Sequence, residues 1–155
     1  MSEALLKSIL QREGASTKVI VESAGIEALE GMNPDPNTVE VCRAHGIDIT
    51  AHTARQLTDD MIRDASFVLC LAENHKKLIL SAQPEAEAKT FLLKELLLPE
   101  PVADGSIEDP TGQSPKKYEA CFTEVQDEIT RIAPSIIRRA LRLEWERQRK
   151  QPRAT

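Results

Sequence analysis

Apolar and polar residues follow one another along the chain in patterns that predict helices and short strands in turn. Residues 2–13 carry apolar side chains at helical spacing, and Gly14 follows where a helix C-cap is expected. Residues 18–22 form a short β-branched run that ends at Ser23. This part of the chain therefore predicts an amphipathic helix followed by a buried strand and a turn.

Two further helices are expected after a loop rich in proline. Asp35 or Asn37 can accept hydrogen bonds from the first amides of a helix that runs to His45 and stops at Gly46. A short helix should follow Thr58, whose side chain can cap its first turn. The stretch between these helices is polar and is expected to form a connector.

The clearest strand signal is the continuous apolar run at residues 66–72, which is typical of a strand covered on both faces. We expect it in the middle of a parallel sheet, followed by a helix over residues 73–81 and a strand over residues 90–93. A long last helix is predicted from Ser114 to about Leu143, with a kink at Pro134. The alternation indicates a three-layer, doubly wound α/β fold with its site beyond the carboxyl ends of the strands.

Length and composition agree with one globular domain. The chain has 155 residues, of which 41% are hydrophobic and 29% are charged. No apolar segment has the length of a signal peptide or a membrane span, so we expect a cytoplasmic protein. The three cysteines, Cys42, Cys70 and Cys121, include no C-x-x-C pair and are expected to be reduced.

Charge is distributed unevenly along the chain. The net charge is −5, but the stretch from Arg138 onward carries +5, which leaves −10 for the remainder. An acidic body argues against general binding to nucleic acid. We divide the chain into a domain over residues 1–141 and a basic helical tail over residues 142–155. We interpret the tail as a solvated helix end, with contact to acidic partners or lipid as the alternative.

One acidic residue stands in a setting that suits catalysis. Asp109 precedes Pro110, which restricts the residue before it to extended conformations, and Gly112 lets the chain turn before the last helix. Asp109 would therefore be presented in one direction, as a catalytic acid on a loop. An Asp-Pro sequence with a nearby glycine is also a common turn.

The sequence gives little support for a metal or nucleotide site. Cys42 and His45 are spaced as a helical pair with His52 nearby, but a further ligand at a fixed spacing is absent, so we expect no metal and no cofactor. No cysteine is followed six residues later by arginine, because those positions hold Asp48, Lys76 and Asp127. Glycine-rich phosphate loops are also absent. By composition alone, His52 is a surface or structural histidine.

Several short motifs occur in an order that resembles the low-molecular-weight protein tyrosine phosphatases, which include bacterial phosphoarginine phosphatases and related arsenate reductases. The resemblance covers residues 1–141. The matching stretches are Met1-Ser2-Glu3-Ala4-Leu5-Leu6, Glu22-Ser23-Ala24-Gly25, His45-Gly46-Ile47, the run from Ala51 to Thr58, Phe67-Val68-Leu69-Cys70-Leu71 and Ile107-Glu108-Asp109-Pro110.

The resemblance implies roles for three residues. Asp109 would protonate the leaving group and then activate water, while Ser23 and His52 would belong to a polar network that supports the phosphate loop. The substrate would be a phosphorylated protein or a small phosphomonoester, hydrolysed through a cysteinyl-phosphate without metal. Thr111 and Gly112 stand where phosphotyrosine-specific members often carry aromatic residues, which favours the phosphoarginine branch.

One departure from the family is large. Its members begin with a central strand that runs into a C-x5-R-S phosphate loop, and we expect both to be missing from this chain. The 155 residues are therefore predicted to be inactive as they stand. The alternatives are a non-catalytic remnant that binds a partner and an arsenate reductase, which would need thiols placed for a redox relay.

Overall fold

The computed structural model describes residues 1–150 except 101 and 103, and it consists mainly of helices around a small parallel sheet. Each helix and strand is short apart from the last helix. In chain order the elements are α1 (Ser2–Arg12), α2 (Pro36–Ala44), α3 (Asp59–Asp64), β1 (Val68–Cys70), α4 (Glu73–Ala82), the 3₁₀ helix η1 (Pro84–Lys89), β2 (Thr90–Leu92) and α5 (Pro115–Lys150).

The ends of the first helices are set by the residues that the sequence indicates. Gly14, at φ +67°, ends α1, and the amide of Ala15 donates to the carbonyl of Leu10 at 2.8 Å. Such a bond satisfies a carbonyl that the helix itself leaves unpaired, and glycine adopts this conformation without a Cβ clash. At the start of α2 the Asp35 carboxylate accepts from the amide of Asn37 at 2.8 Å, as predicted.

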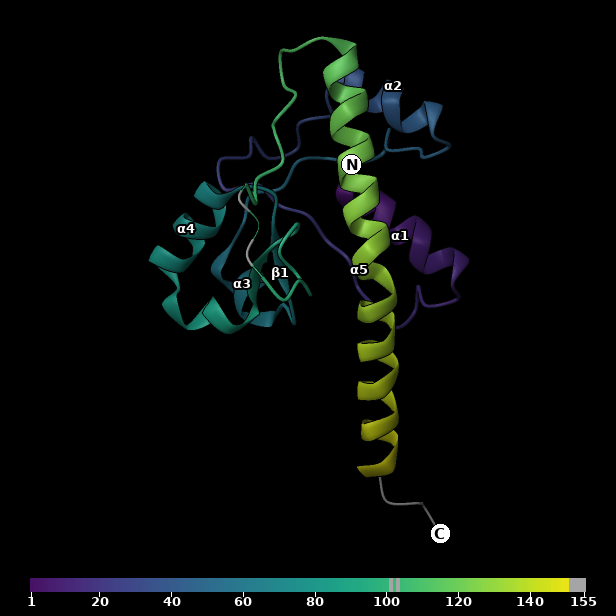
Figure 1. The fold of residues 1–155 in the computed structure, drawn as a ribbon, viewed down its shortest axis with the longest axis vertical. Helices are drawn as coiled ribbons and strands as arrows, with labels where there is room; N and C mark the ends of the chain where they lie inside the picture. Colours follow the sequence, from purple (N-terminus) through teal and green to yellow (C-terminus); the bar gives the residue numbers. More distant parts are fainter. Residues whose placement is uncertain (101, 103, 151–155) are drawn as a thin grey trace.

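The sheet contains two parallel strands with helices on both faces. β1 and β2 pair in parallel, with Leu69 beside Phe91 and Cys70 beside Leu92. Leu69 and Phe91 pack against the larger core, which α1 and α5 complete, whereas Cys70 and Leu92 pack against a smaller core with α3 and α4. Figure 1 shows α3 and α4 on one side of β1, and α1 and α5 on the other. The α/β prediction with a parallel sheet is confirmed.

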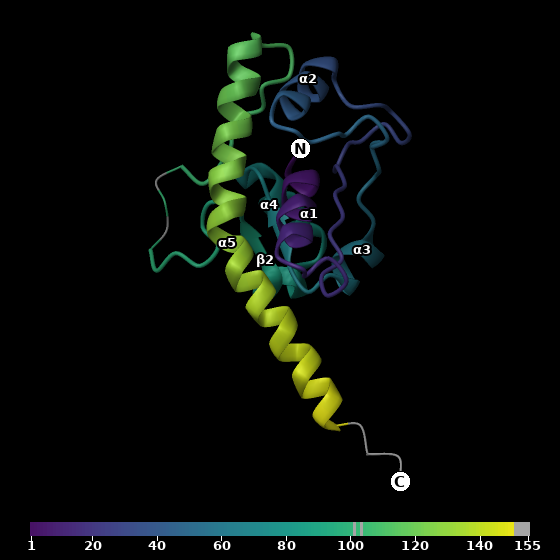
Figure 2. The ribbon, with the colours of Figure 1, turned by 90° about the vertical axis from the view of Figure 1, so that its right-hand side faces the viewer.

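Helix α5 forms the long axis of the molecule and closes the larger core. It continues through Pro134 to Lys150, beyond the end predicted near Leu143, and its axis changes direction part-way along in Figure 2. In the part of the chain that the structure describes, no helix is long and apolar enough to cross a bilayer. The buried face of α5 consists of Tyr118, Phe122, Val125, Ile129, Ile132 and Ala133.

The predicted strand at residues 18–22 is wrong. Val19 and Val21 pack against the larger core and Ile20 is 91% exposed, so the side chains alternate as in a strand. The backbone of this segment nevertheless pairs with no strand in the described chain. A strand requires hydrogen bonds to a neighbouring backbone, and residues 19–22 form no such pairing in the part of the chain that the structure describes. For the same reason β1 pairs with β2 alone and is not central in the sheet.

Candidate functional site

A cleft of about 750 Å³ lies between α1, the extended segment at residues 16–23 and the connector at residues 51–55. Two of the three residues predicted for the site, Ser23 and His52, line it. Its remaining walls come from polar side chains of α1 and from the unpaired segment after Ser16. The structure therefore brings together two residues that lie 29 positions apart in the sequence.

Glu3 is the centre of the polar contacts in this cleft. The Ser23 hydroxyl donates to one carboxylate oxygen of Glu3 at 2.5 Å, and the Lys7 ammonium donates to the other at 2.5 Å. Burial alone would raise the pKa of Glu3, whose side chain is 15% exposed, but the hydrogen bonds from Lys7 and Ser23 hold it below its ordinary value. The positive potential of nearby His52 acts in the same direction. Glu3 is thus an anion that fixes the Ser23 side chain.

Arg55 joins the connector to the segment that carries Ser23. Its guanidinium donates to the carbonyl of Ser23 at 3.0 Å and to the Glu22 carboxylate at 3.2 Å. Two backbone bonds of 2.9 Å, from Gly25 to Arg55 and from Leu57 to Gly25, form a short parallel bridge beside it. These contacts hold residues 51–55, and with them His52, next to Ser23.

Three side chains of this cleft were not singled out from the sequence, namely Glu3, Lys7 and Arg55. Glu3 and Lys7 are spaced by four residues on α1, a spacing at which opposite charges attract on any helix surface. Such pairs are common, so spacing alone gives no reason to choose this one. Arg55 lies three residues after His52, within the run from Ala51 to Thr58 that resembles the family, and these were the available signals.

Asp109 lies outside the residues that line this cleft. Its side chain accepts a hydrogen bond from the amide of Thr111 at 2.9 Å, and its carbonyl accepts from the Gln113 side chain at 2.8 Å. Gly112, at φ +76°, turns the chain toward α5, as predicted. Asp109 is exposed at this turn, on the loop that leads from the sheet to α5.

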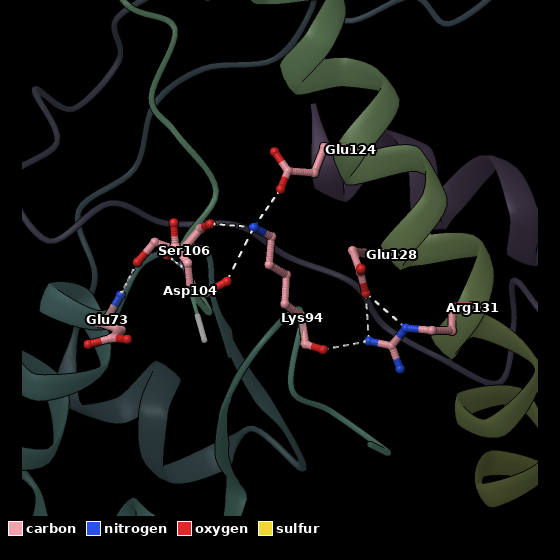
Figure 3. Close-up of polar contacts among 7 residues, drawn as sticks. All are labelled: Glu73, Lys94, Asp104, Ser106, Glu124, Glu128 and Arg131. Atoms are coloured by element: carbon pink, nitrogen blue, oxygen red, sulfur yellow. Dashed lines mark hydrogen bonds and ion pairs between the residues drawn. The ribbon is translucent and has the colours of Figure 1, made fainter. Parts of the chain in front are cut away.

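The chain leading to Asp109 is fastened to the sheet and to α5, as Figure 3 shows. The Lys94 ammonium donates to the carbonyl of Ser106 at 2.7 Å and pairs with Glu124 of α5 at 2.5 Å. The Ser106 hydroxyl accepts from the amide of Glu73, the first residue of α4, at 3.0 Å. The amide of Ile107 donates to the carbonyl of Leu71 at 2.7 Å. The last of these anchors lies two residues before Asp109.

Arg131 fixes the turn that carries Lys94. Its guanidinium donates to the carbonyls of Leu93 at 3.1 Å, Lys94 at 3.0 Å and Leu96 at 2.6 Å, and it pairs with Glu128. The bond to Lys94 and the pair with Glu128 are visible in Figure 3. A planar guanidinium suits this arrangement, because it presents several donors in fixed directions.

Gly105 lies where the same loop crosses the sheet. A Cβ atom at this position would be 2.5 Å from Cδ1 of Leu92, and Leu92 is itself buried in the smaller core. The loop backbone can approach the sheet this closely only because residue 105 lacks a side chain.

None of the three thiols is suited to nucleophilic attack. Cys42 and Cys70 are buried and Cys121 is partly buried. Burial raises the pKa of all three, that of Cys70 to about 11, so each is protonated near neutral pH. Their burial distinguishes these three cysteines from exposed, reactive thiols.

His45, considered with Cys42 as a metal ligand, makes other contacts. Its ring stacks on Phe122, with the ring centroids 4.1 Å apart, and Nε2 lies 2.7 Å from the Glu119 carboxylate. Within residues 1–150, apart from 101 and 103, no three His, Cys, Asp or Glu side chains are grouped as a metal site requires. His45 thus joins α2 to α5.

Comparisons with known proteins agree with this architecture. The family model described as low molecular weight phosphotyrosine protein phosphatase matches residues 1–144. A protein-arginine-phosphatase of Geobacillus stearothermophilus is 36% identical over 118 residues, which are 76% of this chain and 77% of the relative. The "Probable low molecular weight protein-tyrosine-phosphatase EpsP" of Ralstonia solanacearum is 32% identical over 136 residues, or 88% and 86% of the two chains.

A solved structure has the same fold. The YwlE arginine phosphatase from Geobacillus stearothermophilus superposes with a TM-score of 0.76 at 31% identity, covering 99% of this chain and 89% of that one. Fold, ordered motifs and family match coincide over nearly all of the described residues. The chain therefore belongs to the low molecular weight phosphotyrosine protein phosphatase family.

Proposed function

We propose that this chain provides the general acid and the phosphate-site support of a cysteine-dependent protein phosphatase. The cleft carries the proposal: Ser23, His52 and Glu3 form a polar wall beside an extended segment whose backbone has no strand partner among the described residues. A phosphate-binding loop needs such a wall, because its amides must be fixed in advance to stabilise developing charge. The family match supports the assignment.

In this proposal the complete sheet is doubly wound and contains one more strand, between residues 18–22 and β1. Residues 19–21 already alternate inward and outward as a strand does. A strand inserted beside them would use their free backbone groups and would end in the phosphate loop at the cleft. Ser23 and His52 would then contact that loop and act as positioning residues.

The reaction would take place in two steps around Asp109. A cysteine thiolate attacks phosphorus and the bond to the leaving oxygen or nitrogen breaks, while Asp109 gives its proton to the leaving group. Asp109, now a carboxylate, takes a proton from water as that water attacks the cysteinyl-phosphate. Inorganic phosphate leaves and the thiolate is regenerated. Asp109 can move toward the substrate only within the reach allowed by the anchors at Ser106 and Ile107.

Phosphoarginine is the substrate that we favour over phosphotyrosine. Thr111 and Gly112 leave the stretch after Asp109-Pro110 without an aromatic side chain to stack on a phenyl ring. A protein-arginine-phosphatase of Geobacillus stearothermophilus is also 36% identical over 118 residues. Comparison of kcat/KM for phosphoarginine and phosphotyrosine peptides tests this preference, and a higher value for phosphotyrosine would refute it.

The decisive experiment compares the 155-residue chain with a version that carries an added strand and C-x5-R loop before Met1. The first should not turn over p-nitrophenyl phosphate, since Cys42, Cys70 and Cys121 are protonated and no arginine follows them at the required spacing. The extended version should turn over. If the unextended chain shows thiol-dependent turnover, one of its own cysteines is the nucleophile and the proposal fails.

In the extended version, Asp109→Asn tests the general acid separately from the residues that support the phosphate loop. It should lower kcat by about 10²- to 10⁴-fold while a cysteinyl-phosphate still forms from a substrate with a good leaving group. His52→Ala should instead weaken phosphate affinity as well as the rate, because it loosens the loop. His75→Ala, in α4 and outside the cleft, is the matched control. An unchanged rate and phosphate affinity in His52→Ala would make His52 a purely structural residue.

A non-catalytic role remains a second candidate, favoured by the same lack of a usable thiolate. The chain would then bind a phosphorylated partner through the cleft without hydrolysing it. Failure of the extended version to turn over any substrate, together with retained binding of a phosphopeptide by the 155-residue chain, would favour this role.

A further inference from the structure

The C-terminal part of α5 projects beyond the rest of the fold. Figures 1 and 2 both show it continuing past the other helices. Residues 138–150 would span about 20 Å at the rise of an α-helix. This projecting part is not needed to close the core, because the buried face of α5 ends at Ala133.

One side of the projecting helix is apolar and accessible. Ile137, Leu141 and Trp145 follow one another at intervals of four residues, so they lie in one stripe along the helix. Leu141 is 48% exposed and Trp145 is 55% exposed, whereas Ile137, just before the projecting part, packs against the larger core. Large apolar side chains grouped in this way usually mark a contact surface.

Basic side chains border this stripe along one side. At 100° per residue, Arg138, Arg142 and Arg149 fall next to Leu141 and Trp145 on the helix. The Arg149 guanidinium lies 4.5 Å from the centre of the Trp145 ring. Arg139, by contrast, is turned back toward the body, over the ring of Phe67 at 4.7 Å.

The acidic residues of the same stretch cancel only part of this charge. Glu144 pairs with Lys18 of the body at 2.5 Å, and Glu146 pairs with Arg142 at 3.0 Å. The stretch from Arg138 onward has a net charge of +5 in a chain whose total is −5. A helix with a positive border and an apolar stripe that contains tryptophan fits the boundary between lipid headgroups and acyl chains.

We propose that the projecting part of α5 binds the surface of an anionic lipid bilayer, with Leu141 and Trp145 in the headgroup boundary and the arginines against the lipid phosphates. The helix is still in contact with the body at Glu144, which pairs with Lys18, and residues 145–150 extend about 9 Å further, about one screening length at physiological salt. The proposal is independent of the phosphatase chemistry.

Other occupants fit the surface less well. A coiled-coil partner needs apolar positions that alternate by three and four over several heptads, whereas this stripe has only intervals of four. A second copy of the chain would have to place the basic helix of one copy against the acidic body of the other. Such a head-to-tail contact does not by itself produce a closed, symmetric dimer.

The single tryptophan makes the test direct, because Trp145 is the only one in the chain. The 155-residue chain is mixed with vesicles of phosphatidylcholine alone or of phosphatidylcholine with phosphatidylglycerol, and Trp145 emission and co-flotation are measured. We expect a blue shift and co-flotation with the anionic vesicles only, and we expect added salt to reverse both.

Two pairs of variants separate the contributions of charge and of the apolar stripe. Arg138→Glu with Arg142→Glu should weaken partitioning at least about tenfold, since each basic residue near an anionic surface contributes about fivefold. Arg12→Glu with Lys116→Glu changes the net charge equally, on the body, and should leave partitioning nearly unchanged. Leu141→Ser should weaken it, whereas Leu143→Ser, on another side of the helix, should not.

Three outcomes would overturn the proposal: equal binding to both kinds of vesicle or to neither, equal loss in each variant and its control, or a blue shift that appears with protein concentration in the absence of lipid. The last outcome would indicate contact between copies of the chain. Circular dichroism of every variant verifies that the helix is retained.

Discussion

Residues 19–21 and strand β1 are both short, apolar and extended, but only β1 is paired with another strand. β1 is paired with β2 and contributes to the cores on both faces of the sheet. The segment at residues 19–21 turns two valines toward the larger core, but its backbone pairs with no strand in the described chain. Side-chain burial alone thus keeps a segment extended without making it a strand. The unpaired segment is also the one that lines the cleft.

The largest difference expected between the two regions is in hydrogen exchange. In the described chain no hydrogen bond is made by the backbone amides of residues 19–24, whereas the amide of Leu93, next to β2, donates to Cys70 at 2.9 Å. Amides in the core open with free energies approaching the global stability, about 5 kcal/mol or more, and unbonded amides open at almost no cost. Exchange measured by NMR should differ by more than about a thousandfold.

Protection of residues 19–24 equal to that of Leu93 would show that the segment has a backbone partner. The same measurement on the version extended by a strand provides the positive comparison. There the amides of Val19 and Val21 should become slow, whereas those of β2 should hardly change.

The second prediction concerns packing. Leu92→Ala should destabilise the protein by about 2 to 5 kcal/mol, because Leu92 is fully buried between the sheet, α3 and α4. Ile20→Ala, in the unpaired segment, should change stability by less than about 0.5 kcal/mol, since Ile20 is on the surface. Urea unfolding followed by circular dichroism measures both. A cost for Ile20→Ala comparable to that of Leu92→Ala would mean that residue 20 is covered in solution.

The third prediction concerns how the stability of the fold depends on pH. The folded-state pKa of Glu3 lies below its ordinary value of 4.5, so its ionised form stabilises the fold at higher pH. That contribution, about 1 kcal/mol, is complete above the unfolded pKa and is lost as the pH falls through the folded pKa. Glu3→Gln should therefore lower stability near neutral pH and flatten its dependence on pH below about 5.

Glu13→Gln is the control for this charge change, because Glu13 is an exposed residue at the opposite end of α1. It should leave the pH dependence almost as it is in the unaltered chain. If Glu3→Gln and Glu13→Gln have identical profiles, the contacts of Glu3 with Ser23 and Lys7 do not persist in solution.

The smallest effect is expected at the start of the unpaired segment. Lys18 pairs with Glu144 of α5, and both side chains are about one third exposed. Lys18→Met should lower the free energy of unfolding by about 0.2 to 1 kcal/mol. The loss should be smaller at high salt, because salt screens a partly exposed ion pair. A double-mutant cycle with Glu144→Gln isolates the pair, and a coupling energy of zero would show that it contributes nothing.

Local signals in the sequence predicted most helix boundaries correctly. Gly14 and Gly46 end α1 and α2, Asp35 caps α2 and Thr58 caps α3, because each acts on backbone groups within four residues of itself. The helix predicted to about Leu143 and the helical tail predicted after it form one continuous helix to Lys150, although its last turns have no apolar face against the core. The strand at residues 18–22 was wrong because its formation depends on a partner elsewhere in the chain.

The site was predictable only through the order of its motifs. Ser23 and His52 are unremarkable in composition, and their resemblance to the family led to the cleft that they line. Glu3 and Arg55 make the bonds that hold this wall together, but charge pairs of this kind are too common in sequences to be selected. The role of Asp109 stays a prediction that the acid substitution tests.

Gly105 has a consequence for how sequences of this protein can vary. Loops usually accept substitutions, but even alanine at position 105 would place its Cβ 2.5 Å from Cδ1 of Leu92, so this buried side chain would have to shift in a closely packed core. Mutational scanning should therefore find this loop position as intolerant as a core residue. Among sequences related to this chain, position 105 should therefore rarely vary, whereas neighbouring exposed positions of the loop should vary freely.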